Sequence, residues 1–177
     1  LKAAAKKIRD PYNPQTVYFP SGVYLVKGTL KVDRVSLRGN NAVIVQQDPE
    51  ATTFDYINFW HASVKGLVFK GGKGHIAAVN DNLDKSLFFV ENCKFFWCTG
   101  TALMTRKGAQ STLFTIEKSE FIHCIGSIDS DSDWTVIRDV WIMNNKDMKN
   151  SAVIVNRHGY MTVDNLLGVP LCNGQSQ

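Results

Sequence analysis

Three aspartates spaced two residues apart, with a tryptophan directly after them, form the stretch of this sequence best suited to chemistry. The stretch reads Asp129-Ser-Asp-Ser-Asp133-Trp134. Side chains two residues apart on a β-strand point to the same side, so the three carboxylates are expected to face one way. Paired carboxylates with cations beside them suit general acid–base catalysis on a glycosidic bond, or cation binding that offsets an acidic sugar.

Cationic residues that could complete this site occur in segments 106–108 and 156–159, which read Arg-Lys-Gly and Asn-Arg-His-Gly. We predict that the catalytic groups are Asp131, Asp133, Arg157 and His158. We predict that the substrate-binding groups are Asp129, Arg106, Lys107 and Trp134, the last because an outward indole can stack on a sugar ring. A second interpretation stays open, in which Asp and Ser are ordinary turn residues that only pair with surface arginines.

No metal site is predicted. The cysteines at positions 93, 98, 124 and 172 lack the CxxC spacing of a zinc site or a redox pair, and are interpreted as small buried thiols. The aspartate stretch does not fit a calcium-binding EF-hand loop, because it lacks the glycine and has Val140 where the distal glutamate belongs. His75 and His123 are interpreted as structural or surface residues.

Composition excludes several classes of protein. The chain of 177 residues is 44% hydrophobic, which suits one domain with a continuous core. A formal net charge of +4 without a Lys/Arg cluster falls short of a nucleic-acid-binding surface. The longest apolar runs, such as Ser86 to Val90, have strand length and are too short to span a membrane.

An internal repeat predicts the elements that position these residues. Five segments share the pattern apolar, polar, turn-former, small or apolar, variable, apolar; they begin at Val64, Val90, Ile116, Ile137 and Val163, at steps of 26, 26, 21 and 26. A second series begins at Gly74, Gly100, Gly126 and Asn150, at steps of 26, 26 and 24. Each period has room for about three short strands and none for a helix, which indicates a coil of parallel β-strands.

The repeat also predicts which residues stack. Because successive coils lie about 4.8 Å apart, equivalent residues form ladders along the axis. One ladder is predicted from Phe69, Phe95, Phe121 and Ile142, and Cys98 is predicted to stack on Cys124 without a disulfide. In the second series, Ile76, Ala78, Ala102, Met104, Ile128, Ala152 and Ile154 are predicted to face inward. That register leaves Leu103 and Val153 exposed.

Turn lengths predict a groove over the aspartates. The distance from the start of the second series to the next Val/Ile position is shortest in the third coil, where Gly126 and Ile137 mark it. The short turn is therefore expected to be the floor of a groove. Its walls would be the longer turns at 106–108 and 156–159.

The opening of the chain carries a family resemblance. A helical Ala/Lys-rich segment at Leu1 to Arg9 precedes Val17-Tyr-Phe-Pro-Ser-Gly-Val-Tyr-Leu25, Thr29-Leu30 and Val35-Ser-Leu-Arg-Gly39. This resembles the start of the pectate-lyase-like β-helix superfamily, the pectin lyase fold. The resemblance implies an all-β, right-handed parallel β-helix solenoid with an N-terminal capping α-helix at residues 1–10 and coils at 11–177. No comparable helix closes the other end, so the coils are expected to continue beyond Gln177 or to be covered by another chain.

The resemblance also implies a function. Members of this superfamily cleave acidic polysaccharides by Ca²⁺-assisted β-elimination or hydrolyse glycosides with paired aspartates, and others are tailspikes or adhesins. We therefore expect a secreted or cell-surface polysaccharide lyase or glycoside hydrolase whose partner is an extracellular polysaccharide or oligosaccharide. No cofactor is expected, except Ca²⁺ if the chain is a lyase, and neither a nucleic-acid partner nor a membrane span is expected. The alternative is a non-catalytic glycan-binding or stalk β-helix of a cell-surface or phage tail protein.

Overall fold

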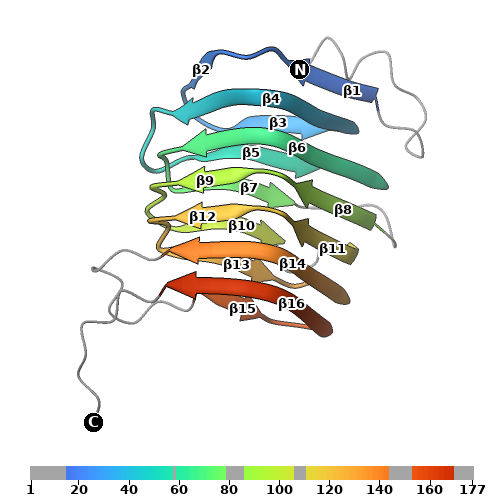
Figure 1. The fold of residues 1–177 in the computed structure, drawn as a ribbon. Coiled ribbons are helices and arrows are strands. Elements are labelled where there is room, and N and C mark those ends of the chain that lie inside the picture. The colour runs from blue at the N-terminus through green and yellow to red at the C-terminus, as the bar shows by residue number, and fades with distance from the viewer. Residues whose placement is uncertain (1–14, 58, 79–85, 106–110, 144–152, 170–177) are drawn as a thin grey trace.

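A computed structural model describes residues 15–57, 59–78, 86–105, 111–143 and 153–169, and this part of the chain is a parallel β-solenoid of about five turns (Figure 1). Sixteen strands of the described residues form two sheets, and within each sheet neighbouring strands pair in parallel. The larger sheet contains β1 (Gln15–Phe19), β2 (Val23–Val26), β4 (Val35–Gln46), β6 (His61–Lys70), β8 (Ser86–Glu91), β9 (Lys94–Phe96), β11 (Ser111–Glu117), β12 (Glu120–Ile122), β14 (Trp134–Met143) and β16 (Tyr160–Val169). The smaller sheet contains β3 (Leu30–Asp33), β5 (Thr52–Ile57), β7 (Gly74–Ala78), β10 (Thr101–Thr105), β13 (Gly126–Ser130) and β15 (Ile154–Asn156).

The first repeat series is confirmed residue by residue. Val64 pairs with Val90, Val90 with Ile116, Ile116 with Ile137 and Ile137 with Val163. All of these side chains are buried except Val163 in the last described coil. The ladder therefore runs through the core of the solenoid, as the repeat predicted.

The aromatic ladder is confirmed as well. The rings of Phe69 and Phe95 stack at 5.1 Å, and those of Phe95 and Phe121 stack at 4.8 Å. Phe121 then pairs with Ile142 on β14. The ring separations approach the spacing between strands, so one aromatic side chain per coil fills the same site along the axis.

The turn-former of the first series bends the chain at a corner of each coil. The residues at this position all have positive φ angles: Gly66, Asn92, Lys118, Asp139 and Asn165. A second corner has the same conformation at Gly71, Trp97 and His123. One left-handed residue turns the chain while the flanking residues remain in the sheets, and glycine and asparagine adopt this conformation at least cost.

The predicted register of the smaller sheet is wrong for Leu103 and Met104 on β10, although Ala102 is buried as predicted. Leu103 pairs with both Ile76 and Ile128 and is fully buried, whereas Met104 pairs with Asp129 and is half-buried. The repeat predicted that paired residues are 26 positions apart in the sequence, but Ile76 and Leu103 are 27 apart and Leu103 and Ile128 are 25 apart. The difference arises because the corner before β10 contains one extra residue. A slip of one residue exchanges the two faces of a strand, and for this reason Leu103 lies inside and Met104 does not.

Several predictions concern residues outside the described ranges. These are the capping helix at residues 1–10, the site residues Arg106 and Lys107, Ala152 and Cys172. Within the described ranges the chain contains strands and turns but no helix, and thus no helix that is long and apolar enough to cross a membrane.

Candidate functional site

The predicted aspartates lie where β13 ends and β14 begins. Ser130 and Ser132 are buried, whereas Asp129 and Asp131 are half-buried and Asp133 is exposed. The alternation continues through the turn, so the three carboxylates lie on the outer side of the coil. This agrees with the prediction that they face one way.

Buried hydroxyl groups on the inner side of this turn form hydrogen bonds that stabilise it. The Ser130 and Thr135 hydroxyl oxygens are 2.6 Å apart, and the Ser132 N–H donates to Ser130 Oγ at 3.3 Å. From the neighbouring coil, Thr105 Oγ1 accepts the Asp131 N–H at 2.6 Å. These hydrogen bonds fix the backbone, so the aspartates project from a firmly held turn.

Arg157 is bound to one of the three aspartates. Its Nε and an Nη each donate to an Asp129 carboxylate oxygen at 2.6 Å. This bidentate hydrogen bond raises the pKa of the Arg157 guanidinium above its ordinary value, and the charge of Asp131 acts in the same direction. Arg157 is therefore a fixed cation at the edge of the aspartates, and its closest partner is Asp129 rather than the two aspartates predicted to be catalytic.

His158 approaches a different carboxylate. Its Nε2 lies 3.7 Å from Asp133 Oδ1, and both side chains are exposed. This distance exceeds that of a hydrogen bond but permits an electrostatic interaction when the imidazole is protonated. Of the four predicted catalytic residues, the structure thus brings Asp133 and His158 together, with Asp131 two positions away on the same turn.

Two exposed aromatic side chains extend the site along the outer face. Trp134 is 53% exposed, as its predicted outward orientation requires, and it pairs in register with Tyr160, which is 80% exposed. The Trp134 Nε1–H donates to Thr162 Oγ1 at 3.3 Å, which orients the indole. Sequence reasoning missed Tyr160, although its position, 26 residues after Trp134, follows directly from the repeat.

These residues surround an open depression of about 650 Å³. Its lining includes Asp133, Trp134, His158, Gly159 and Tyr160. Gly159 has a φ of +69°, and a Cβ atom there would overlap the backbone carbonyl of Asp133. Glycine therefore permits the close contact between turns that places His158 beside Asp133. We call Asp129, Asp131, Asp133, Trp134, Arg157, His158 and Tyr160 the aspartate–aromatic patch.

The predicted groove does not have its second wall. Three residues connect β13 to β14, and three residues, Arg157 to Gly159, connect β15 to β16. Ile128 pairs with Ile154, so the additional residues of this coil precede β15 instead of following it. The expected wall at 156–159 is therefore as short as the floor, and the wall at 106–108 lies outside the described residues.

No family model and no curated protein matches this chain.

The acidic groups of the patch do not converge as metal ligands would. Among the described residues, one group of three His, Cys, Asp or Glu side chains has ligand atoms that converge, and it consists of His75, Cys98 and Cys124. It lies in the core, apart from the patch. The patch is thus an arrangement of carboxylates, one fixed cation, an imidazole and two aromatic faces.

Proposed function

We propose that this chain is a carbohydrate-active protein with the right-handed coil and N-terminal cap of the pectate-lyase-like superfamily. It would form part of a secreted or cell-surface polysaccharide lyase or glycoside hydrolase. The observation that carries the proposal is the exposed, in-register pair Trp134 and Tyr160 beside Asp133 and His158. Aromatic faces bind the apolar side of a sugar ring, and neighbouring carboxylates supply the groups that act on the glycosidic bond.

The patch favours hydrolysis over elimination with arginine as the base. A lyase base must release a proton before it accepts one from the sugar, but the carboxylate of Asp129 raises the pKa of Arg157 and keeps it charged. In hydrolysis, one of Asp131 and Asp133 would donate a proton to the leaving oxygen and the other would activate water. His158 would orient Asp133, and Arg157 would hold an acidic or hydroxyl group of the sugar.

The test is a screen of neutral and acidic polysaccharides for binding and for cleavage products. Reducing ends without unsaturated sugars are expected, because hydrolysis adds water whereas elimination creates a double bond. The double variant Asp131→Asn and Asp133→Asn keeps the shape of the turn but removes both charges, so we expect cleavage to fall at least a hundredfold, as loss of acid–base groups does. The control is Glu91→Gln with Glu120→Gln, which removes two carboxylates outside the patch.

Full cleavage by the asparagine variant would show that these aspartates are turn residues. Loss of cleavage in the glutamine control would show that net charge, and not the patch, is responsible. Either result would contradict the assignment of catalysis to Asp131 and Asp133.

A second candidate is a non-catalytic glycan-binding or stalk protein. It is favoured by the ion pair that occupies Arg157 and by the 3.7 Å separation of His158 and Asp133, which is too long for proton transfer. Binding without products would support it. Sedimentation adds a second criterion, because a phage tail stalk is expected to be a trimer and the enzyme a monomer.

A further inference from the structure

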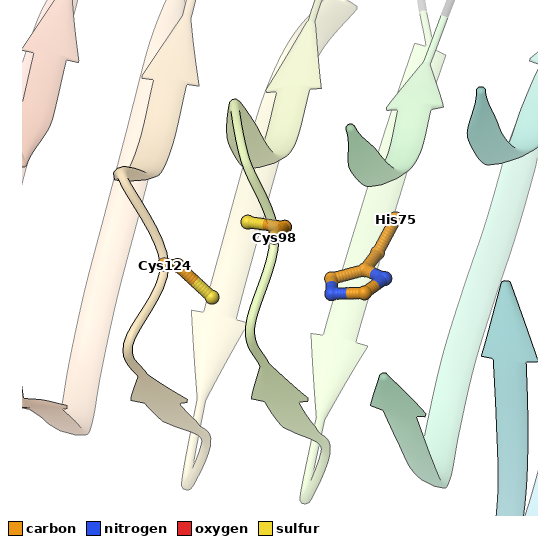
Figure 2. A group of neighbouring side chains, drawn as sticks. All are labelled: His75, Cys98 and Cys124. Carbon is orange, nitrogen blue, oxygen red and sulfur yellow. The ribbon is translucent and has the colours of Figure 1, made fainter. Parts of the chain in front are cut away.

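His75, Cys98 and Cys124 meet inside the solenoid. All three side chains are buried, and the ligand atoms that they offer lie within 4.8 Å of one another. His75 belongs to β7, while Cys98 and Cys124 lie in the corners after β9 and β12, so three successive coils contribute one residue each (Figure 2).

The imidazole of His75 has no hydrogen-bond partner. Both Nδ1 and Nε2 are buried and unpaired, although any protonation state of the ring includes at least one N–H donor. Its ring contacts are aromatic: the centroid of Phe69 lies at 5.6 Å and that of Phe95 at 5.7 Å. Native cores rarely leave a polar side chain unsatisfied on both sides, so this ring indicates a missing partner.

The registers of the coils explain why the three side chains can converge. Cys98 and Cys124 follow the left-handed residues Trp97 and His123 in equivalent corners. By the pairing of Ile76, Leu103 and Ile128, His75 stands in one row with the small residues Ala102 and Ser127. The large imidazole therefore has only small residues next to it in its row, and the buried Oγ of Ser127, two strands away in the same row, is also unpaired.

Packing of thiols alone does not account for the cluster. Each sulfur has a backbone carbonyl as a weak partner, Gly100 O at 3.3 Å from Cys98 Sγ and Phe95 O at 3.5 Å from Cys124 Sγ. These contacts satisfy the thiols but leave His75 without a partner.

We propose that His75, Cys98 and Cys124 form a buried site for a thiophilic d¹⁰ metal ion, Zn²⁺ or Cu⁺. Two sulfurs and an imidazole nitrogen are ligands that both ions accept. Two thiolates neutralise Zn²⁺, so its complex would carry no net charge in an apolar core. Cu⁺ requires no fourth ligand, whereas Zn²⁺ in structural sites takes four.

The site is tested by refolding, because buried ligands give an ion no path into the folded chain. The full chain is unfolded in reductant and chelator and then refolded without oxygen in Zn²⁺ or in Cu⁺. Elemental analysis after gel filtration is expected to find about one ion per chain. Retention of Zn²⁺ or of Cu⁺ identifies the ion, and retention of neither overturns the proposal.

Cysteine variants locate the bound ion. The variant Cys98→Ala with Cys124→Ala should lose the ion, whereas Cys93→Ala should retain it, because Cys93 is a buried free thiol of the same core outside the cluster. Equal retention by the double variant would overturn the proposal. The bound ion should also raise the unfolding midpoint of the unaltered chain and of Cys93→Ala, but not that of the double variant.

A third measurement needs only the unaltered chain, so it does not depend on the folding of any variant. Refolding in Co²⁺, which accepts the ligands of Zn²⁺, should produce thiolate-to-cobalt charge-transfer absorption. If Zn²⁺ is retained but this absorption is absent, the metal is not bound by the cysteines and the proposal fails.

Discussion

Trp134 and Tyr160 expose large aromatic faces beside charged groups, an arrangement suited to a sugar ring. Replacing Trp134 with alanine should weaken glycan binding about two- to tenfold, since aromatic stacking contributes about 0.5–1.5 kcal/mol. Stability should change little, because the indole is more than half exposed. Titration with the polysaccharide that the parent chain binds best measures the loss.

A second exposed tryptophan provides the control. Trp97 is 54% exposed, but it lies in the corner after β9, outside the patch. Trp97→Ala should leave glycan affinity unchanged. If it weakens binding as much as Trp134→Ala does, the glycan does not bind at the patch.

Gly159 links the two short turns of the patch. Alanine at this position would combine a φ of +69° with an overlap between Cβ and the carbonyl of Asp133. We expect Gly159→Ala to cost about 1–3 kcal/mol and to lower glycan binding by displacing His158 and Tyr160. Chemical denaturation and binding titration measure the two effects.

Gly28→Ala is the control that separates the cost of the backbone conformation from the cost of the steric overlap. Gly28 has a φ of +75°, but a Cβ atom there would meet nothing within 4 Å. Its substitution should cost about 1 kcal/mol through backbone conformation alone. Equal losses at the two glycines would mean that the contact with Asp133 has no part in stability.

At the scale of the strands, the aromatic ladder concentrates buried area. Phe121 is fully buried between Phe95 and Ile142. Phe121→Ala should therefore cost about 3–5 kcal/mol in chemical denaturation. Phe96→Ala is the matched control, because Phe96 is only half-buried on the other side of β9, and a comparable loss there would contradict the observed register.

Paired strands also carry a pH-dependent ion pair. Lys65 on β6 lies 2.7 Å from Glu91 on β8, and this hydrogen bond lowers the pKa of Glu91, with the charges of Lys118 and Arg38 adding to the effect. Because the folded-state pKa is the lower one, ionised Glu91 stabilises the fold above its unfolded-state pKa. That contribution is lost as pH falls through the folded-state pKa.

Glu91→Gln should therefore be less stable than the parent at neutral pH and equally stable in strong acid. The difference at neutral pH should stay below about 1 kcal/mol, since both side chains are partly exposed to solvent. Unfolding midpoints measured across the acid range test this. A difference that persists once the carboxyl is protonated in both the folded and the unfolded state would assign the effect to packing.

Sequence periodicity predicts the larger sheet better than the smaller one, for a physical reason. In the larger sheet, valine, isoleucine and phenylalanine recur at fixed positions, so that a shift of one residue would expose several of them. In the smaller sheet, small residues flank the inward positions, as Ala102 flanks Leu103, and hydrophobicity does not distinguish the two registers. The extra residue in the corner before β10 therefore could not be detected from the hydrophobic pattern.

Part of the candidate site could be predicted from the sequence, and the rest depends on the register between strands. The outward direction of the aspartates and of Trp134 follows from strand alternation and could be predicted. The pairing of Arg157 with Asp129 depends on the register between β13 and β15, which the repeat placed two residues away from its observed position. The cluster around His75 could not be predicted from spacing, because its ligands come from three coils and from two different rows.

At the scale of the whole molecule, each coil contacts chiefly its neighbours, so position along the axis affects the contribution of a residue to stability. Central coils are covered on both sides. In the last described coil, Leu166 and Leu167 on β16 are exposed, as is Val163. The same side chain at the same ladder position should therefore contribute less in this coil than in the middle.

Val90 and Val163 permit this comparison within one ladder. Val90 is 1% exposed between Val64 and Ile116, whereas Val163 is 46% exposed and pairs with Ile137. Val90→Ala should cost about 1.5–3 kcal/mol, because it removes two buried methyl groups and leaves a cavity, and Val163→Ala should cost less than about 1 kcal/mol. The change in β-propensity is the same in both variants and cancels from the comparison.

Chemical denaturation of the two variants measures the difference. Equal losses would mean that Val163 is covered in solution, either by residues outside the described ranges or by a second chain. If the loss of stability in Val163→Ala depends on protein concentration, a second chain covers this residue.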